Sequence, residues 1–521
     1  MSLDCVIGTF AGLGLQTILV GLFGALLVIW CFGSRKQTTS NLPPGPTGLP
    51  LLGYLPFLKL PPFKGFTHLA KQYGGLISLR LGTKLCVVLN DVDSVRQSLI
   101  KEADVFTDRN VPIEYSLALP LEGSLAFASG DKWRELRTFV AKSFRLFEVE
   151  KEKLESVIVR ESERLCKAFH DEASESSSGG DAFDPHHIIK NAVSNIICSI
   201  CFGQTYEYSD PEFKHILTVV GNSFRSLSPS GLLLVSRYFY YTPLYREVRH
   251  DLAILQDFIR GIVQRHQETF DPDNTRDIID MYLAEVRQLK EDGKETHLKE
   301  ENIWRGVFDI FLAASESMTS ALRWILLYLI AHPGLQRKIR ADILRVIGPS
   351  RNPTIKDRDE LPLIEATCME VLRLRPPAPM GGPRQVKRDV EVKGYVIPEG
   401  TLVLTNVWHI HQNAENWQDP ERFNPSRFLN EDGKELVKNP AFLPYGAGRR
   451  LCIGDRIARM QMFLFLTTLI RRFEFSLPDG DVPDFNVDGG NFTLSAVPFQ
   501  IIVREVESNM APTAVHTQIE D

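Results

Sequence analysis

The chain has too few cysteines and too little positive charge for two broad classes of protein. Eight cysteines among 521 residues are too sparse for a disulfide framework. The formal net charge of -6 argues against a general nucleic-acid-binding protein. No internal repeat and no break in composition divides the chain, so its length is compatible with one large domain as well as with several. The hydrophobic content of 44% is ordinary for a globular protein.

Charge is also missing from the N-terminal segment, where residues 5–34 contain no charged side chain. This segment is apolar and long enough to cross a bilayer as a helix. Asp4 precedes it, whereas Arg35 and Lys36 follow it, so the positive-inside bias places the rest of the chain in the cytosol. We predict an uncleaved single-pass transmembrane anchor over residues 1–36. A cleaved signal peptide, the alternative, would carry basic residues before the apolar run.

Prolines then interrupt the chain, and helical patterns dominate the sequence that follows. Residues 37–50 include Leu42-Pro-Pro-Gly-Pro-Thr-Gly-Leu-Pro50, which favours stiff, extended backbone, so we predict a hinge. Long helical patterns run from Asp131 to Arg345. The sequence predicts a mainly α fold with a minor β-sheet region and a polar, frayed tail over 505–521. The strand patterns lie at residues 76–82, 84–89, 390–397 and 402–405.

The most informative segment runs from Phe442 to Gly454 and reads FLPYGAGRRLCIG. Its glycines allow tight turns and remove side-chain bulk, so a flat ligand can lie against the backbone. Backbone amides around Cys452, and the start of the helix that follows, favour the thiolate form of the cysteine. A thiolate on haem iron pushes electron density toward the metal and favours O–O cleavage. Arg450 is well placed to meet a haem propionate.

This segment resembles the cysteine-ligand loop of the cytochrome P450 haem-thiolate monooxygenases, whose pattern is Phe-Gly-x-Gly-x-Arg-x-Cys-x-Gly. Every position matches except the first, where Tyr445 replaces phenylalanine. The resemblance extends from the hinge to about Arg504. Within the family, the chain most resembles animal microsomal members that hydroxylate drugs, fatty acids or steroids. It implies a single large catalytic domain over residues 51–504, haem b as cofactor and Cys452 as the metal ligand.

The resemblance also implies partners and a location. It implies that O₂ and a hydrophobic small molecule (a xenobiotic, fatty acid or steroid) are the substrates, and that electrons come from NADPH through the flavins of a flavoprotein reductase. The expected location is the endoplasmic reticulum membrane, with the catalytic domain facing the cytosol. Arg134, Arg449 and Arg456 are candidates for a reductase-docking surface. Two alternatives stay open: a haem-thiolate isomerase that rearranges lipid hydroperoxides, and an inactive haem-binding protein.

Three further residues are candidates for binding the haem propionates. A spacing of four puts Trp133 and Arg137 on one helix face. The resemblance implies that both bind propionates, the arginine through its guanidinium and the tryptophan through its indole N–H. Arg384, which follows Gly381-Gly-Pro, is a weaker candidate. Together with Arg450 these residues form the predicted cofactor-binding set.

The predicted helix over residues 301–331 contains the expected oxygen-side motif. The family pattern is Ala-Gly-x-Glu-Thr-Thr, and this chain departs from it at Ala314, Ser317 and Met318. Ser317 keeps the hydroxyl of the family threonine, which helps to deliver protons during oxygen activation, but loses the methyl group that restricts its rotamer. Bonding of this hydroxyl to the carbonyl of Ala313 would open the helix locally. We predict that Ser317 and Glu316 form the proton route.

The remaining motifs are structural or substrate-facing. In the family, Glu370 and Arg373 form a buried polar triad with an arginine of a later segment, here taken as Arg422. Cys198 and Cys201 have metal-ligand spacing but lie in an apolar run without a second pair, which favours a core helix. Apolar or aromatic segments are expected to line a hydrophobic substrate pocket. These segments are the loop that follows Phe106, the helix residues Phe308 and Phe311, the tripeptide Ala378-Pro-Met380, and Phe492.

Overall fold

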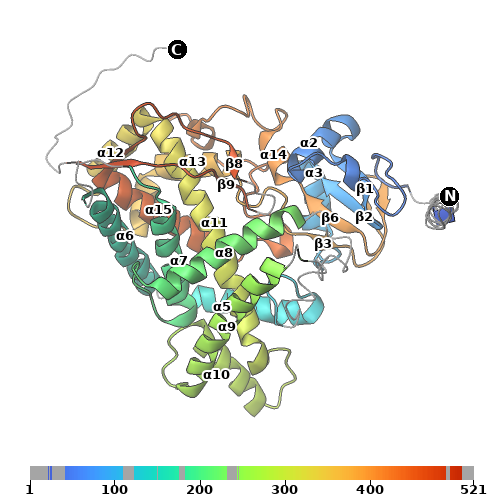
Figure 1. Ribbon diagram of the computed structural model, residues 1–521, viewed down its shortest axis with the longest axis horizontal. Helices are drawn as coiled ribbons and strands as arrows, with labels where there is room; N and C mark the ends of the chain where they lie inside the picture. Colours follow the sequence, from blue (N-terminus) through green and yellow to red (C-terminus); the bar gives the residue numbers. More distant parts are fainter. Residues whose placement is uncertain are drawn as a thin grey trace, which may run out of the picture.

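The fold is mainly α-helical with small sheets, as the sequence predicts (Figure 1). The computed structural model describes residues 21–22, 24–25, 41–109, 123–149, 151–174, 182–230, 243, 246–488 and 493–506. Apart from four residues, the predicted anchor lies outside the described residues. Nearly all of the predicted tail, and Phe492, also lie outside them, so these predictions stand untested.

Helices make up the body of the molecule, and they follow the predicted helical region closely. The longer ones surround α11, which crosses the molecule behind α8 in Figure 1. The helices are α2 (Pro62–Tyr73), α3 (Val92–Val95), α5 (Gly130–Val149), α6 (Lys151–Ser174), α7 (His186–Phe202), α8 (Pro211–Ser230), α9 (Arg246–Glu268), α10 (Ile278–Glu291), α11 (Ile303–Ala331), α12 (Pro333–Val346), α13 (Pro362–Leu374), α14 (Val407–Gln412) and α15 (Asp455–Arg472).

Short helical turns connect several of these elements. A π-helical turn, η3 (Arg96–Lys101), continues α3, and a 3-10 turn, η9 (Gly448–Arg450), precedes the cysteine of the motif segment. The others are η2 (Leu55–Phe57), η6 (Glu300–Asn302), η7 (Ile355–Glu360) and η8 (Pro425–Phe428).

Helix α11 forms the centre of the core because it is apolar on nearly all of its faces. Within the described ranges it is the one helix long and apolar enough to cross a membrane, but 83% of its most apolar window is buried inside the protein, which is typical of a core helix. The helix ends before Pro333, as expected, because the residue that precedes a proline is disfavoured in helical geometry. Helices α7, α8, α9 and α13 all pack against α11.

Four strands form one sheet beside the helical body (Figure 1). Strands β1 and β2 form the predicted antiparallel hairpin, β2 pairs in parallel with β6, and β6 pairs with β3. The strands are β1 (Leu76–Leu81), β2 (Lys84–Leu89), β3 (Arg384–Gln385), β4 (Val390–Val392), β5 (Tyr395–Ile397), β6 (Leu402–Thr405), β7 (Phe473–Ser476), β8 (Val487–Asp488), β9 (Ser495–Ala496) and β10 (Ile502–Glu505). Strands β4–β5, β7–β10 and β8–β9 form two-stranded sheets.

The Cys-x-x-Cys pair is part of the core, as predicted. Cys198 and Cys201 lie on α7 and are fully buried. Burial raises the pKa of both thiols, so they stay protonated and behave as small apolar side chains.

Candidate active site

The segment around Cys452 lies between η9 and the start of α15. Its first turn is closed by a hydrogen bond from the Cys452 amide to the carbonyl of Tyr445, at 2.9 Å. Gly448 has a φ of 70°, and a Cβ there would lie 1.8 Å from the carbonyl oxygen of Leu99. This glycine is therefore required because the loop packs directly on η3, which is a different reason from the access for a flat ligand that the sequence suggests.

Cys452 is the accessible thiol of the described chain. It is exposed, whereas the five other free cysteines of the described residues are buried. Although part of the residue is exposed, desolvation of the thiol by the surrounding loop raises the pKa of Cys452, whereas the Gly454 amide and Arg137 lower it. The Gly454 amide thus favours thiolate, as predicted, whereas desolvation of the thiol opposes it. A coordinated metal ion removes the thiol proton outright.

Four arginines converge near this loop, and each is held by backbone carbonyls. The Arg384 guanidinium donates to Phe106 and Ala447, at 3.2 and 2.9 Å. Arg450 donates to the Thr107 carbonyl at 2.8 Å, and Arg137 donates to the Leu451 carbonyl at 2.6 Å. The fourth arginine is Arg109, which donates to Ala126 and Pro383, at 3.0 Å in each case.

The electrostatics of this arginine cluster favour an anionic ligand. Burial, followed by repulsion from Arg109, Arg384 and Arg137, lowers the pKa of Arg450 to about 8. Burial and repulsion from Arg109 and Arg137 lower the pKa of Arg384 to about 9, and burial and repulsion from Arg137 lower that of Arg109 to about 10. Carbonyl dipoles position the guanidiniums but do not neutralise them, so the cluster has excess positive charge. A cofactor with two carboxylates would compensate this charge.

Trp133 on α5 connects the arginine cluster to the helix. The guanidinium of Arg450 lies 3.8 Å from the centre of the indole ring, and that of Arg137 lies 5.7 Å from it. The indole Nε1 is buried and has no hydrogen-bond partner among the described residues. Because a buried donor without an acceptor is costly, this N–H also fits a carboxylate-bearing ligand. Trp133, Arg137, Arg384 and Arg450 are thus brought together as predicted.

Sequence reasoning missed Arg109. It lies in an irregular segment before α5, without a periodic pattern that relates it to the other arginines. The signal in the sequence is weak, since a single arginine in a loop is usually a solvated surface charge. Only the fold shows that Arg109 reaches the carbonyl of Pro383, next to Arg384.

The oxygen-side motif lies in the middle of α11. The Ser317 hydroxyl donates to the Ala313 carbonyl at 2.8 Å, as the sequence suggests. However, α11 is continuously α-helical from Ile303 to Ala331, so the expected local opening of the helix is wrong. Back-bonding of this kind leaves the i→i−4 ladder intact when the carbonyl accepts both donors. Ala313 is exposed and Ser317 is partly exposed, although the helix is otherwise almost entirely buried.

Comparison with known proteins agrees with this geometry. Residues 43–503 match the family Cytochrome P450. The chain is 35% identical to cytochrome P450 2U1 of Homo sapiens over 515 residues, which cover 93% of each chain. It is 35% identical to cytochrome P450 2J3 of Rattus norvegicus over 449 residues, covering 85% of this chain and 88% of the relative. It is 33% identical to cytochrome P450 2D15 of Canis lupus familiaris over 501 residues, covering 94% and 98%.

The chain belongs to the cytochrome P450 family. It is therefore a monooxygenase, and the family implies haem iron as cofactor. The residues present fit haem. An accessible cysteine that could ligate the iron and a cluster of arginines that could bind the two propionates occur in one region of this cytochrome P450.

The buried polar triad of this cytochrome P450 differs from the predicted one. Glu370 and Arg373 are fully buried and form a two-point ion pair at 2.7 and 2.9 Å. The third side chain is Arg427, which lies 3.2 Å from Glu370. Arg422 contributes only its backbone carbonyl, which accepts from Arg373 and Arg427. The prediction of Arg422 is wrong because its side chain is exposed, whereas η8 directs Arg427 inward.

Glu316 has a partner that the sequence did not suggest. Its carboxylate lies 3.0 Å from the ammonium group of Lys190 on α7, and both side chains are buried. The structure thus brings Glu316 and Ser317 to neighbouring positions of α11 but fixes the acid on a second helix.

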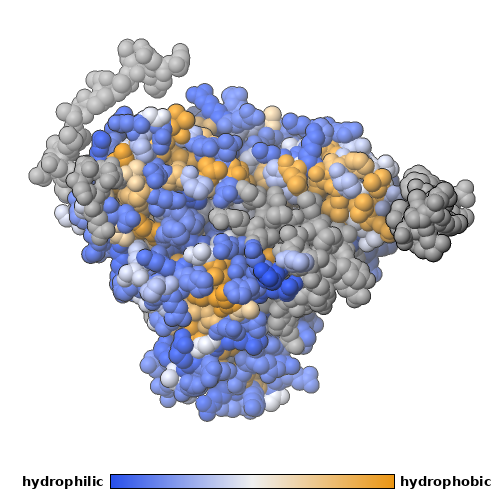
Figure 2. Space-filling view, viewed as in Figure 1, coloured by the Kyte–Doolittle hydropathy of each residue, from blue (hydrophilic) through white to orange (hydrophobic). Residues whose placement is uncertain are grey.

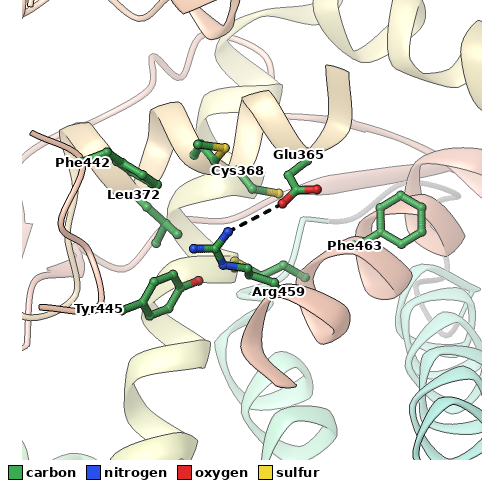
Figure 3. Close-up of a pocket in the computed structure, with 9 residues that line it drawn as sticks. Glu365, Cys368, Leu372, Phe442, Tyr445, Arg459 and Phe463 are labelled. Carbon is green, nitrogen blue, oxygen red and sulfur yellow. Dashed lines mark ion pairs between the residues drawn. The ribbon is translucent and has the colours of Figure 1, made fainter. Parts of the chain in front are cut away.

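Tyr445, the one departure within the cysteine motif, lines a small pocket together with Cys368, Phe442 and Arg459 (Figure 3). The Arg459 guanidinium lies 5.1 Å from the Tyr445 ring centre and forms a 4.0 Å ion pair with Glu365, the dashed line in Figure 3. The Tyr445 hydroxyl has no hydrogen-bond partner among the described residues. Burial raises the pKa of Tyr445, so the hydroxyl remains neutral.

Of the residues predicted to face the substrate, Phe308 and Phe311 are packed into the core, whereas Ala378 is exposed. Phe311 is buried and packs against the rings of Phe202 and Phe258, with centroids 5.7 and 6.2 Å away. Phe308 is buried as well, as is Phe106, which precedes the predicted substrate-facing loop. Core packing therefore accounts for these aromatic side chains in the described structure.

Proposed function

We propose that this cytochrome P450 inserts one oxygen atom from O₂ into a hydrophobic small molecule (a xenobiotic, fatty acid or steroid), using electrons from NADPH through a flavoprotein reductase. The observation that supports this proposal best is the combination of accessible Cys452 with a cluster of arginines that repel one another. The apolar, partly exposed Ala313 and Ala314 on α11 support an apolar substrate.

Haem would be held from two sides. Cys452 would ligate the iron, and the bound cofactor would supply oxygen activation. Trp133 and the arginines 109, 137, 384 and 450 would bind the propionates, since their donors are already fixed by carbonyls and by the ring contacts of the indole. Fixed donors lose little conformational entropy when a carboxylate binds.

Ser317 and Glu316 would move protons. The Ser317 hydroxyl, directed by the Ala313 carbonyl, is the alcohol that gives up and regains a proton. Glu316 is the acid nearest to it in sequence on α11. A positioned proton donor contributes about 100- to 10,000-fold to a proton-transfer step, so a misplaced one diverts reduced oxygen to peroxide.

A basic cleft along α5 supports the reductase proposal. It is lined by Arg134, Arg137, Lys142, Arg145 and Arg449, and it also contains Trp133. Two of the predicted docking residues, Arg134 and Arg449, thus share one surface close to the proposed haem. Positive charge there would attract an acidic partner and bring it near the electron acceptor. Arg456, the third predicted residue, is exposed at the start of α15.

The experiment that tests the function is reconstitution in lipid vesicles with NADPH, a microsomal flavoprotein reductase and ¹⁸O₂. We expect one labelled oxygen atom in the product of an apolar substrate, and more peroxide per NADPH with Ser317→Ala, whereas Ser317→Thr behaves like the unchanged enzyme. Turnover of a lipid hydroperoxide without reductase or NADPH, in place of this reaction, would establish the isomerase. Haem uptake without oxygen consumption would establish the inactive protein.

A further inference from the structure

A buried ion pair joins the acid of the proposed proton route to a helix outside that route. Lys190 of α7 and Glu316 of α11 lie 3.0 Å apart, and their side chains are 2% and 10% exposed. No position of the cytochrome P450 motif accounts for a lysine at this place. Because α7 packs along the length of α11, the ammonium group approaches Glu316 from the side of α11 that faces α7.

Because the Lys190–Glu316 pair is buried, each charge depends on the other for its stabilisation. Removing one partner of a buried ion pair leaves an uncompensated charge, which is far more costly than loss of an exposed pair. A buried carboxylate without a partner takes up a proton instead of staying ionised. The ammonium of Lys190 is therefore the charged partner that the buried Glu316 carboxylate needs.

Helix α8 packs over the Lys190–Glu316 ion pair, and the residue of α8 that faces the pair is a glycine. A Cβ at Gly221 would lie 2.8 Å from Lys190 Nζ and 4.0 Å from Glu316 Oε2. Helix α8 crosses in front of α11 and contacts it, as Figure 1 shows. The absence of a side chain at Gly221 thus leaves the space in which the ammonium group meets the carboxylate.

We propose that Lys190 is the positioning residue for Glu316: its ammonium group holds the carboxylate in place beneath α8, so that Glu316 can take up a proton supplied by the solvent and pass it on through Ser317. The ammonium group keeps its own protons throughout. This inference deepens the proposed function and rests on it, because it assigns the residue through which the acid of that proton route is held.

The first test needs no turnover. Infrared spectra of the haem-loaded protein report the carbonyl stretch of a protonated carboxyl group. We expect Lys190→Met to gain such a band, Lys190→Met/Glu316→Gln to lack it, and Lys190→Arg to match the unchanged protein. Lys167→Met is the matched control, since Lys167 forms an exposed ion pair with Asp171 on α6. A Lys190→Met spectrum without the new band overturns the proposal.

The second test uses a variant that touches neither charge. Gly221→Ala improves helix propensity in α8. Its methyl group displaces only the flexible end of Lys190, so the protein should fold while the pair is weakened. We expect Lys190→Met to raise peroxide released per NADPH by roughly tenfold, a small part of what a positioned acid contributes. Gly221→Ala should raise it less, and Lys190→Arg should restore normal values.

Two comparisons separate this inference from the proposed function. If Lys190 acts only through Glu316, then Lys190→Met adds no further leakage in the Glu316→Gln background. Leakage that adds in full to that of Glu316→Gln would overturn the positioning role. If the unchanged enzyme forms no oxygenated product, the proposed function fails. In that case, the infrared band still decides whether Lys190 holds the Glu316 carboxylate.

Discussion

Cys452 is the residue on which the haem chemistry of this cytochrome P450 depends. We expect Cys452→Ser to abolish the strongly red-shifted Soret band of the reduced carbon monoxide complex, because a serine oxygen does not replace a thiolate as donor to iron. The measurement is a difference spectrum of purified, haem-loaded protein. Cys201→Ser is the control, since Cys201 is buried in the core and should leave the band in place. A red-shifted band in Cys452→Ser would mean that the ligand is another residue.

The buried triad offers a comparison between two arginines five residues apart. Arg427→Ala should lower the free energy of unfolding by about 3 kcal/mol, because it leaves Glu370 short of a charged partner in the interior. Arg422→Ala should change it by less than about 0.5 kcal/mol, since its exposed side chain takes no part in the triad. Urea unfolding, with haem content recorded alongside, checks both values. Equal effects would refute the assignment of Arg427.

How far single residues could be predicted depended on how local their constraints are. Cys452 and Arg450 lie in one continuous segment whose spacing carries the chemistry, so the sequence identified them. Arg109 and Lys190 acquire their partners from segments far away in the sequence, and no local pattern marks them. The resemblance points to an arginine of the segment around Arg422, yet the direction of a side chain in an irregular loop is set by packing that only the fold defines.

At the scale of elements, periodicity predicted the secondary structure of single segments better than the pairing of one segment with another. The apolar run that became α11 and the β1–β2 hairpin were recognised because each is defined by its own residues. The parallel pairing of β2 with β6 joins strands that are more than 300 residues apart in the sequence. Such pairing depends on long-range topology, which composition and spacing do not encode.

Helices α9 and α10 are joined by an ion pair that predicts a pH dependence. His266 Nε2 lies 2.7 Å from Asp277, which caps α10. Burial opposes protonation, but the hydrogen bond and charge of Asp277 outweigh it and raise the pKa of His266. A raised pKa contributes stability that is complete below about pH 6.5, the ordinary histidine value, and is lost as the pH rises through the folded value.

We therefore expect His266→Gln to destabilise the α9–α10 junction more at about pH 6 than at about pH 8.5, by roughly 1 kcal/mol for each unit by which the pKa is raised. Amide hydrogen exchange in α10, corrected for intrinsic rates at each pH, is the measurement. His250→Gln is the control, because His250 lies on α9 but is largely exposed. A difference between variant and parent that is constant with pH would contradict the prediction.

At the scale of the whole molecule, charge on one face should control electron supply. Reversal of two exposed charges of the α5 cleft, in Lys142→Glu/Arg145→Glu, should weaken apparent affinity for an acidic reductase by roughly tenfold at low salt. The effect should shrink as ionic strength rises, since salt screens exposed charges. Lys338→Glu/Arg345→Glu on α12, away from α5 in Figure 1, is the matched control. Equal loss in both double variants would exclude the cleft as docking site.

Attachment to the membrane should involve the folded body as well as the predicted anchor over residues 1–36. Figure 2 shows apolar atoms gathered on the part of the molecule where Figure 1 draws α2 and β1. There, large apolar side chains are 46–62% exposed, and each would contribute roughly 1 kcal/mol on entering lipid. They are Leu49, Leu51, Leu52, Phe57 and Leu60.

We therefore expect the chain without residues 1–36 to remain partly bound to phosphatidylcholine vesicles in a flotation assay. Leu51→Glu/Phe57→Glu in this background should release it, because charged side chains cannot enter the acyl region without a large penalty. Val482→Glu, at an exposed apolar residue elsewhere on the surface, should leave binding unchanged. Complete release of the truncated chain before any substitution would show that the anchor alone attaches it. Persistent binding of the double variant would place the contact on another surface.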